Sequence, residues 1–256
     1  MASSRSLKVT LTYDGTDFCG WQLQPNGRSV QEVLENAWQS ITSESIRITA
    51  SGRTDAGVHA LSQVVSLRTE SRLDNPTLIK AWNANLPADV RILDAIDVSK
   101  DFHAIRDARR KHYRYLLQDS PLTNVFQRRY VWHLPKRLDC SAMCSAAVAL
   151  VGEHDFAAFQ SSGSPRKTTK RHVFWLKVKR TESTSLTGPL LSIDVEANGF
   201  LYNMVRNIVG TLVEVGRGRQ SIDWPKSVLA SRDRRQAGPT APAIGLYLVN
   251  VAYDPK

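Results

Sequence analysis

The stretch IRITASGRTDAGVHALSQVVSLR (residues 46–68) contains a polar loop between two segments with the pattern of β-strands. Residues 46–50 alternate apolar and polar side chains, and residues 63–68 are rich in β-branched side chains, as is typical of strands. Two glycines flank Asp55 in the loop, and glycine permits backbone conformations that let another molecule approach the main chain closely. The stretch therefore predicts two strands joined by a loop that can receive a ligand.

Asp55 is the candidate catalytic residue of this loop. Arg53 lies two positions before it, and a nearby guanidinium lowers the pKa of a carboxyl group and keeps it ionised. An ionised carboxylate can act as a nucleophile or as a general base. The alternative is a polar turn in which Asp55 bonds to its own backbone, the more common role of aspartate in such segments. The residues by themselves leave both interpretations open.

Outside this loop, side-chain periodicity predicts an α+β protein. Strand patterns occur at residues 7–13, 90–98, 111–117, 172–180, 190–197 and 246–251. Helical spacing of apolar side chains occurs at residues 30–41, 75–86, 139–151, 203–215 and from residue 223 onward. Ser29 and Glu32 have the spacing of a capping box. The order of elements in the first 98 residues favours a mainly antiparallel sheet over parallel βαβ winding.

The charge of the 256-residue chain, +10 in total, is unevenly distributed. Residues 1–108 carry 11 Lys and Arg against 13 Asp and Glu, whereas residues 109–256 carry 23 against 11. The polar segment 101–108 has no sustained period and separates the two parts. We therefore expect an N-terminal α+β subdomain, residues 1–108, that carries the Asp55 loop, and a basic C-terminal α+β subdomain, residues 109–256, that binds RNA.

Basic and aromatic side chains occur together in the second half, as in RRKHYRY (residues 109–115) and RRY (residues 128–130). Phosphate contacts combined with base stacking are what looped or single-stranded RNA requires. A merely solvated basic surface is the alternative, and we favour nucleic acid. The sequence has no apolar run long enough to span a bilayer and no metal-type spacing among its three cysteines. We therefore expect a cytoplasmic protein with no membrane partner and no metal.

Arg206 is unusual because it lies in the first turn of the helix that is predicted to begin at Asn203. The helix dipole places partial positive charge at that end, so an arginine is unfavourable there. Arg206 should therefore have a compensating partner, such as a carboxylate or a phosphate, unless it is simply a surface residue. Asn203 belongs to the residue types that favour N-caps, and we expect it to cap this helix.

The order and spacing of eight motifs resemble those of the TruA-type tRNA pseudouridine synthases, over nearly the whole chain. The motifs are Tyr13–Thr16, Gly20–Gln22, Ser29–Gln31, Arg53–Ala60, Lys111–Tyr115, Gly152–Phe159, Gly199–Asn207 and Gly245–Leu248. Each motif alone has low specificity, and their common order makes the resemblance specific.

The resemblance implies a reaction and a set of site residues. The reaction is the isomerisation of uridine to pseudouridine in the anticodon arm of tRNA, at positions 38, 39 and 40, without a redox or group-transfer cofactor. Asp55 is implied to be the catalytic carboxylate. Arg53 is implied to dock RNA or displace the target base, Tyr113 to stack on the flipped uracil, and Arg206 to pair with Asp55.

The resemblance also implies a fold and an assembly: two α+β subdomains with mainly antiparallel sheets that meet across a basic central cleft, in a homodimer. One departure concerns substrate binding. Members of the family often have Arg where this sequence has Ile105, and Arg106 follows one position later. The role of Arg106 is therefore open.

Two other functions remain as alternatives. A noncatalytic RNA-binding module or chaperone would explain the charge and the aromatic residues but gives no reason for the loop with Arg53 and Asp55. A metal-dependent RNA nuclease would also be cationic, but the sequence has no convincing cluster of carboxylates or histidines for a metal ion.

Overall fold

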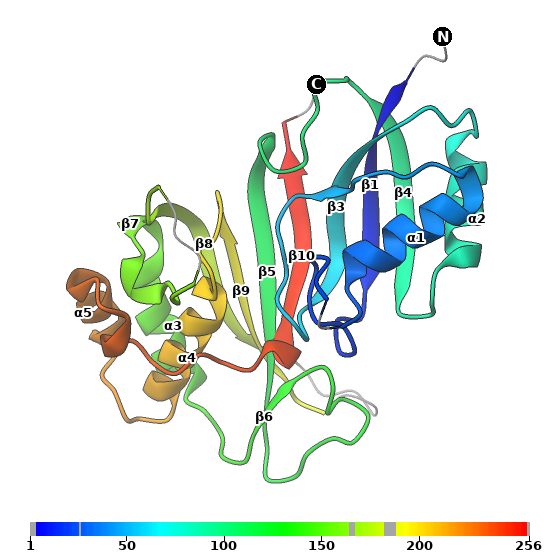
Figure 1. The fold of residues 1–256 in the computed structure, drawn as a ribbon. Coiled ribbons are helices and arrows are strands. Elements are labelled where there is room, and N and C mark those ends of the chain that lie inside the picture. Colours follow the sequence, from blue (N-terminus) through cyan, green and yellow to red (C-terminus); the bar gives the residue numbers. More distant parts are fainter. Residues whose placement is uncertain (1–3, 26, 164–166, 182–187, 255–256) are drawn as a thin grey trace. The chain divides into compact units, whose positions relative to one another are not determined.

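The computed structural model describes residues 4–25, 27–163, 167–181 and 188–254. It is a mixed α/β protein whose strands pair mostly antiparallel (Figure 1). This confirms the expected α+β class with a mainly antiparallel sheet. The chain forms two compact units, Met1–Arg109 with Tyr247–Lys256, and Arg110–Leu246. Each unit is described by itself below.

The sheet of the first unit is built around a pair of long antiparallel strands. Its strands are β1 (Arg5–Tyr13), β2 (Thr49–Ala50), β3 (His59–Thr69), β4 (Val90–Val98) and β10 (Leu246–Tyr253). Strand β1 lies between β3 and β4 and pairs antiparallel with both. Side chains of β1 that point into the core, such as Leu7, Val9 and Leu11, are completely buried. The predicted alternation of the first strand is thus confirmed.

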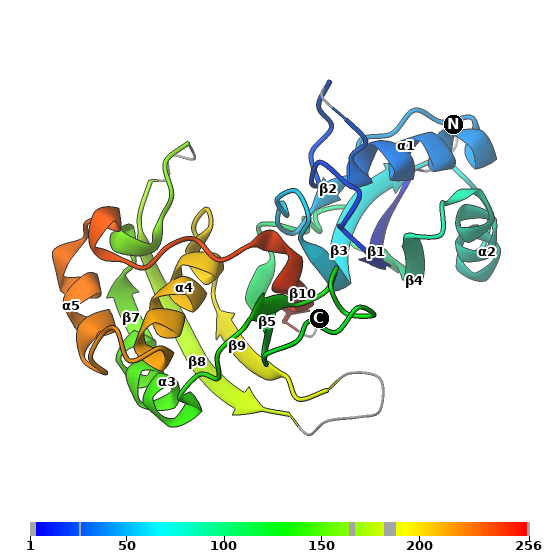
Figure 2. The same cartoon turned by 90° about the horizontal axis from the view of Figure 1, so that it is seen from below.

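Two helices, α1 (Val30–Thr42) and α2 (Asn75–Asn85), complete the first unit. Ser29 and Glu32 form the predicted capping box at the start of α1. The helices pack on each other through Trp38 and Trp82, whose ring centroids are 4.8 Å apart in an edge-on arrangement. Both rings are fully buried, so α1 and α2 together form one apolar layer beside the sheet (Figure 2).

The second unit has a sheet and three helices. Its strands are β5 (Ala108–Asp119), β6 (Trp132–Leu134), β7 (Gly152–Asp155), β8 (Lys170–Arg180) and β9 (Leu191–Ala197), and its helices are α3 (Cys140–Ala147), α4 (Met204–Gly216) and α5 (Trp224–Ser231). Strand β9 pairs antiparallel with β5 and β8. Helix α4 is largely enclosed, since Met204, Ile208 and Leu212 are completely buried.

A bidentate ion pair fixes one end of the sheet in the second unit. Arg180 Nη1 and Nη2 lie 2.6 and 2.7 Å from Asp119 Oδ1 and Oδ2, and the Leu138 amide donates to the same carboxylate at 2.8 Å. Burial opposes ionisation of Asp119, but these donors outweigh it and hold the pKa of the carboxyl group below its usual value. The pair joins β5 to β8 across 61 positions of sequence.

The closing strand lies with the first unit rather than with the second. The subdomains expected from the sequence were residues 1–108 and 109–256, whereas the compact units place the chain from Tyr247 with the first unit. The reason is parallel pairing of β10 with β3, in which Tyr247 is opposite His59 and Leu248 is opposite Ala60. Among the described residues, no helix has the length and apolar character needed to cross a membrane.

Candidate active site

Asp55 lies on the loop between β2 and β3, as predicted. The loop covers residues 51–58 and is shorter than the sequence pattern suggested, because β3 already begins at His59, while β2 begins only at Thr49 and has two residues. The side chain of Glu35 on α1 accepts from the Ile48 amide at 2.9 Å, which takes that donor away from strand pairing. Asp55 is half-buried and Arg53 is exposed.

A β-turn positions the backbone of Asp55. The Val58 amide donates to the Asp55 carbonyl oxygen at 3.1 Å. Gly57, the third residue of the turn, has φ +77°, a conformation that favours glycine at this position. A turn at Asp55 was the alternative to a catalytic role in the sequence analysis, and a turn is present. Its hydrogen bond, however, uses the main-chain carbonyl of Asp55 and not the side-chain carboxylate.

A second segment lies directly against this loop. The Trp21 amide donates to the Thr54 carbonyl at 2.9 Å, and Gly20 forms an isolated antiparallel bridge with Asp55. Gly20 has φ +112°, and a Cβ atom there would lie 2.9 Å from the Thr54 carbonyl oxygen. Only glycine therefore allows the two segments to approach this closely. The glycine of the Gly20–Gln22 motif thus has a role in shaping the Asp55 loop.

A buried polar network holds the loop from the core side. The Tyr13 hydroxyl is 2.7 Å from the Thr54 hydroxyl. Gln63 is completely buried, and its amide group donates to the Gly52 carbonyl at 2.9 Å and accepts from the Ser51 hydroxyl at 2.7 Å. Burial raises the pKa of Tyr13 to about 12, so the phenol is protonated at neutral pH. The loop backbone is thereby fixed on both sides of Arg53.

Arg53 does not form the ion pair with Asp55 that its spacing suggested. In the part of the chain that the structure describes, the Arg53 guanidinium has no hydrogen bond or ion pair. The physical reason is that Thr54 turns inward to Tyr13, whereas the exposed Arg53 side chain extends into solvent. An exposed cation without a protein partner is available to a polyanion.

Tyr113 and Arg206, the other two predicted site residues, lie in the second unit. Tyr113 is on β5 with 8% of its surface exposed, and its ring meets that of Phe200 edge-on at 5.1 Å between centroids. Phe200 belongs to the same motif as Arg206, which the sequence did not connect with Tyr113. Arg206 is half-buried on the first turn of α4.

Two oxygen atoms of the second unit accept from Arg206. Its Nε donates to the Ala241 carbonyl at 2.7 Å, and its Nη1 donates to Asn203 Oδ1 at 2.9 Å. The carbonyl comes from a segment just before β10, which sequence reasoning did not assign to the site. Because both acceptors are neutral, they orient the guanidinium without cancelling its charge.

The basic run on β5 is partly used inside the protein. Arg114 Nε and His112 Nε2 each lie 2.8 Å from Asp194 Oδ1 on β9, and Arg110 lies 3.3 Å from Glu196. Burial opposes ionisation of Asp194, yet the hydrogen bonds from His112 and Arg114 lower its pKa. Cross-strand pairing therefore accounts for part of the charge that the sequence pattern assigned to RNA binding.

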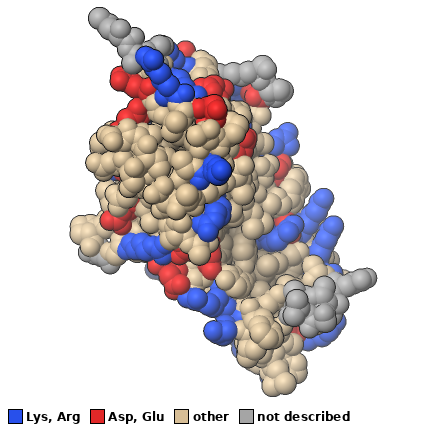
Figure 3. Space-filling model, turned by 90° about the vertical axis from the view of Figure 1, so that its right-hand side faces the viewer, with Lys and Arg blue, Asp and Glu red and all other residues tan. Residues whose placement is uncertain are grey.

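The face of the molecule drawn in Figure 3 carries both positive and negative side chains. The face in Figure 3 is the right-hand side of Figure 1 and carries Lys and Arg as well as Asp and Glu.

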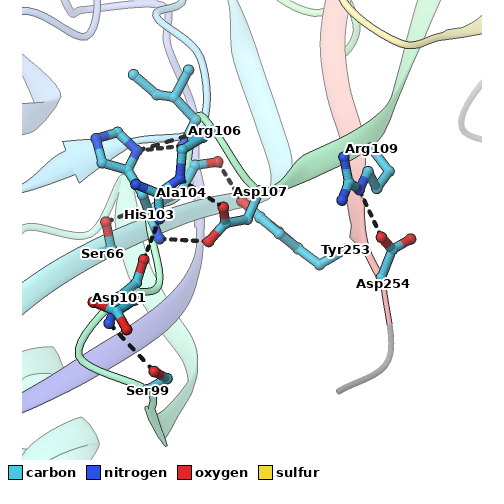
Figure 4. A network of polar contacts seen from close by, with 11 residues as sticks. Ser66, Ser99, Asp101, His103, Ala104, Arg106, Asp107, Arg109, Tyr253 and Asp254 are labelled. Atoms are coloured by element: carbon cyan, nitrogen blue, oxygen red, sulfur yellow. Dashed lines mark hydrogen bonds and ion pairs between the residues drawn. The ribbon is translucent and has the colours of Figure 1, made fainter.

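Arg106, whose role the sequence left open, braces the connection that follows β4 (Figure 4). Its Nε lies 3.0 Å from Asp107 Oδ1, and its Nη2 donates to the Asp101 carbonyl. Ile105, in the position where family members often have Arg, is 54% exposed. The guanidinium of Arg106 thus has partners within its own segment.

The end of β10 holds the same connection in place. The Tyr253 hydroxyl donates to the Ala104 carbonyl at 2.8 Å, and Asp254 pairs with Arg109 at 2.7 Å (Figure 4). Burial raises the pKa of Tyr253, so this donor keeps its proton. The C-terminal residues Tyr253 and Asp254 therefore fix the segment that leads to Tyr113.

Comparison with known proteins adds to this geometry. The sequence profile of a family described as "tRNA pseudouridine synthase" matches residues 10–106 and 146–254. A "tRNA pseudouridine synthase A" of Moorella thermoacetica is 47% identical over 249 residues, which cover 96% of this chain and 99% of that protein. Proteins with the same name from Pelobacter propionicus and Chloroflexus aurantiacus are 44% and 46% identical, over 97% and 98% of this chain and 100% and 90% of those proteins.

Proposed function

The chain belongs to the tRNA pseudouridine synthase family, and from this membership we propose that it isomerises uridine to pseudouridine in the anticodon arm of tRNA, at positions 38, 39 and 40, with Asp55 as the catalytic carboxylate. The observation that carries the assignment of Asp55 is its place on a loop held by Gly20, by the Val58 turn and by the Tyr13 network. A reacting group must be held in one geometry to be effective, and this loop meets that condition.

The reaction needs only groups that the chain itself carries. The bond between ribose C1′ and uracil N1 breaks, the base rotates, and C1′ bonds to C5. The C5 proton is lost and N1 gains a proton, so substrate and product are isomers and no oxidant or group donor takes part. The Asp55 carboxylate either adds to the base or the ribose, or assists proton removal.

The target base must leave its stack before it can react. Extruding a paired base costs a few kcal/mol, and enzymes offset this cost by stacking and by backbone contacts. We assign the stacking to Tyr113, and we assign to the exposed Arg53 a contact with RNA as the base leaves. Arg206 pairs with the Asp55 carboxylate and keeps it ionised. Across a basic central cleft, the second subdomain binds phosphates, in keeping with its excess of Lys and Arg.

The resemblance also supports an assembly and a location. The proposed assembly is a homodimer in which one tRNA touches both subunits, and the proposed location is the cytoplasm. Sedimentation of the protein alone and with tRNA tests the assembly.

The test of the function is pseudouridine mapping of an unmodified tRNA transcript after incubation with the protein and no cofactor. We expect pseudouridine in the anticodon arm with the wild type and none with Asp55→Asn, which keeps the size of the side chain and removes its charge. Asp94→Asn is the matched control, because Asp94 is an exposed aspartate on β4 of the same unit.

The same experiment separates the alternatives. A wild-type protein that binds the transcript and leaves every uridine unchanged is an RNA-binding module. Chelator-sensitive cleavage of the transcript identifies a metal-dependent nuclease. Either result overturns the proposal, and a wild-type rate in Asp55→Asn overturns the role of Asp55.

A further inference from the structure

The N-cap residue of α4, Asn203, differs in backbone conformation and in side-chain bonding from the N-cap residues of α1, α2 and α3. N-cap residues normally have extended backbone angles and accept a hydrogen bond from the first turn, as Ser29, Asp74 and Asp139 do at α1, α2 and α3. Asn203 is at the N-cap position of α4, but it has φ +58° and ψ +8°. The predicted N-cap position of Asn203 is therefore confirmed, but its side chain makes no capping bond among the described residues.

The side chain of Asn203 is used on Arg206 instead. Its Oδ1 accepts from Arg206 Nη1 at 2.9 Å, while the Ala241 carbonyl accepts from Arg206 Nε at 2.7 Å. The two acceptors bind different nitrogen atoms of one planar group, so together they restrict both its position and its rotation. Arg206 is the residue whose place in the first turn opposes the helix dipole.

The Ala241 carbonyl, the second acceptor for Arg206, is held in place by further contacts with α4. The Ala241 amide donates back to the Arg206 carbonyl at 3.2 Å, which ties the segment before β10 to α4. The preceding residue, Thr240, donates to Asn207 Oδ1 at 2.7 Å, and Asn207 is completely buried. A Cβ atom at Gly210 would lie only 1.7 Å from the Pro239 carbonyl oxygen, so the helix and this segment are in direct backbone contact.

Both departures at Asn203 lower stability. The left-handed region is less favourable for any residue other than glycine, although asparagine tolerates it better than most, and a helix start without a side-chain cap leaves amide groups to find other partners. Strained residues that persist in a fold are concentrated at functional sites. Within the described part of the chain, the Asn203 side chain makes one hydrogen bond, which is the bond to Arg206.

We propose that Asn203 is a positioning residue for the isomerisation: it gives up the cap of α4 in order to aim the Arg206 guanidinium at the catalytic carboxylate. The inference rests on the proposed function, in which Arg206 pairs with Asp55. Asn203 itself touches neither the substrate nor the reacting atoms. Its effect is on how often Arg206 is in the productive orientation.

The test compares three variants in single-site pseudouridine assays with unmodified tRNA. Asn203→Gly keeps the backbone conformation without strain and removes the acceptor, and Asn203→Asp keeps an acceptor oxygen. Ser43→Gly is the matched control, because Ser43 is an exposed residue at the end of α1 with φ +62°. It relieves the same kind of strain away from the site.

We expect Asn203→Gly to lower kcat about tenfold or more and to change KM for tRNA by no more than about threefold, because a misplaced catalytic group affects the chemical step rather than binding. Its melting temperature should not fall, since glycine relieves the strain. Asn203→Asp should recover only part of the lost kcat, because it keeps the acceptor oxygen but adds a charge that competes with Asp55 for Arg206, and Ser43→Gly should match the wild type. Unchanged kcat in Asn203→Gly, or equal losses of kcat and melting temperature in both Asn203 variants, would overturn the proposal.

A second measurement is independent of activity. The Nη–H signals of Arg206 in the NMR spectrum are identified by their loss in Arg206→Lys, and their exchange with solvent is compared between the wild type and Asn203→Gly, because Asn203 accepts from Nη1. Faster exchange in the variant supports the positioning role, and equal exchange overturns it. If wild type and Asp55→Asn both leave tRNA unmodified, the proposed function fails, and this exchange rate still decides whether Asn203 orients Arg206.

Discussion

The hydroxyl of Tyr13 lies 2.7 Å from the hydroxyl of Thr54, although the two residues are 41 positions apart in sequence. Thr54 directly precedes Asp55, so this bond ties the first strand of the chain to the candidate catalytic residue. Tyr13 is 3% exposed and Thr54 is 6% exposed. In such a dry environment, a polar group that loses its partner is costly.

Tyr13→Phe should therefore weaken both the fold and the reaction. The substitution removes the hydroxyl group of Tyr13 and leaves the Thr54 hydroxyl without this partner. We therefore expect a loss of about 1 kcal/mol in the free energy of unfolding. A looser Asp55 loop should lower kcat more than it changes KM. Urea unfolding and pseudouridine kinetics measure the two effects, with Thr54→Ser, which keeps the hydroxyl, as the control. A stable Tyr13→Phe protein with wild-type kcat would show that the bond does not position the loop.

Gly20→Ala should disturb the same loop from its other side. The added Cβ atom would lie 2.9 Å from the Thr54 carbonyl oxygen, and φ +112° is strained for alanine. We expect a loss of about 2 kcal/mol or more of stability and a lower kcat. Gly218→Ala is the matched control, because Gly218 has φ +69° with no atom within 4 Å of the new Cβ. Equal effects of the two variants would mean that only backbone strain matters and that the contact with Thr54 does not.

The Asp119–Arg180 pair should make stability depend on acidity. The folded-state pKa of Asp119 is lowered, so its contribution to stability is present above the unfolded-state pKa of about 4 and is lost as the pH falls through the folded-state value. Asp119→Asn should lose on the order of 3 kcal/mol at neutral pH, because Arg180 would be left in a largely buried site without its partner. Melting temperatures of wild type and variant between neutral and acidic pH measure this. The difference between them should narrow towards acidic pH, and a constant difference would contradict the assignment.

Arg106 and Arg53 should differ in their effect on RNA binding. Both are exposed arginines of the first unit, but Arg106 is paired with Asp107 at 3.0 Å. Arg106→Ala should leave the Kd for tRNA within about twofold of the wild type, since the guanidinium is used in its own segment, and should cost less than about 1 kcal/mol of stability. Arg53→Ala should weaken tRNA binding. It should also reduce the slope of log Kd against log salt concentration by the amount expected for about one phosphate contact. The reverse order of effects would identify Arg106 as the phosphate ligand.

Features that depend on neighbouring residues were predictable from the sequence. Helix α1 begins at Ser29 because its capping box is local, and β1 alternates because strand periodicity is local. The position of Asp55 between two strands follows from the same kind of pattern, and the order of the motifs identified the family. The short β2 was not predictable, because Glu35 takes the Ile48 amide from another element.

The partners of the site residues were decided by the tertiary structure. Asn203 is of a residue type that favours N-caps, yet its side chain bonds to Arg206. Arg53 is close to Asp55 in sequence, yet its side chain is exposed to solvent. The closing strand β10 pairs with β3 of the first unit. Sequence spacing determines which residues share a helix turn or a strand face. Which oxygen a side chain reaches depends on segments brought together by folding, as Ala241 is brought to Arg206 across 35 positions. The sequence by itself thus determined the class of fold, the family and the candidate carboxylate, whereas only the packing of distant segments decided how the surrounding side chains are held.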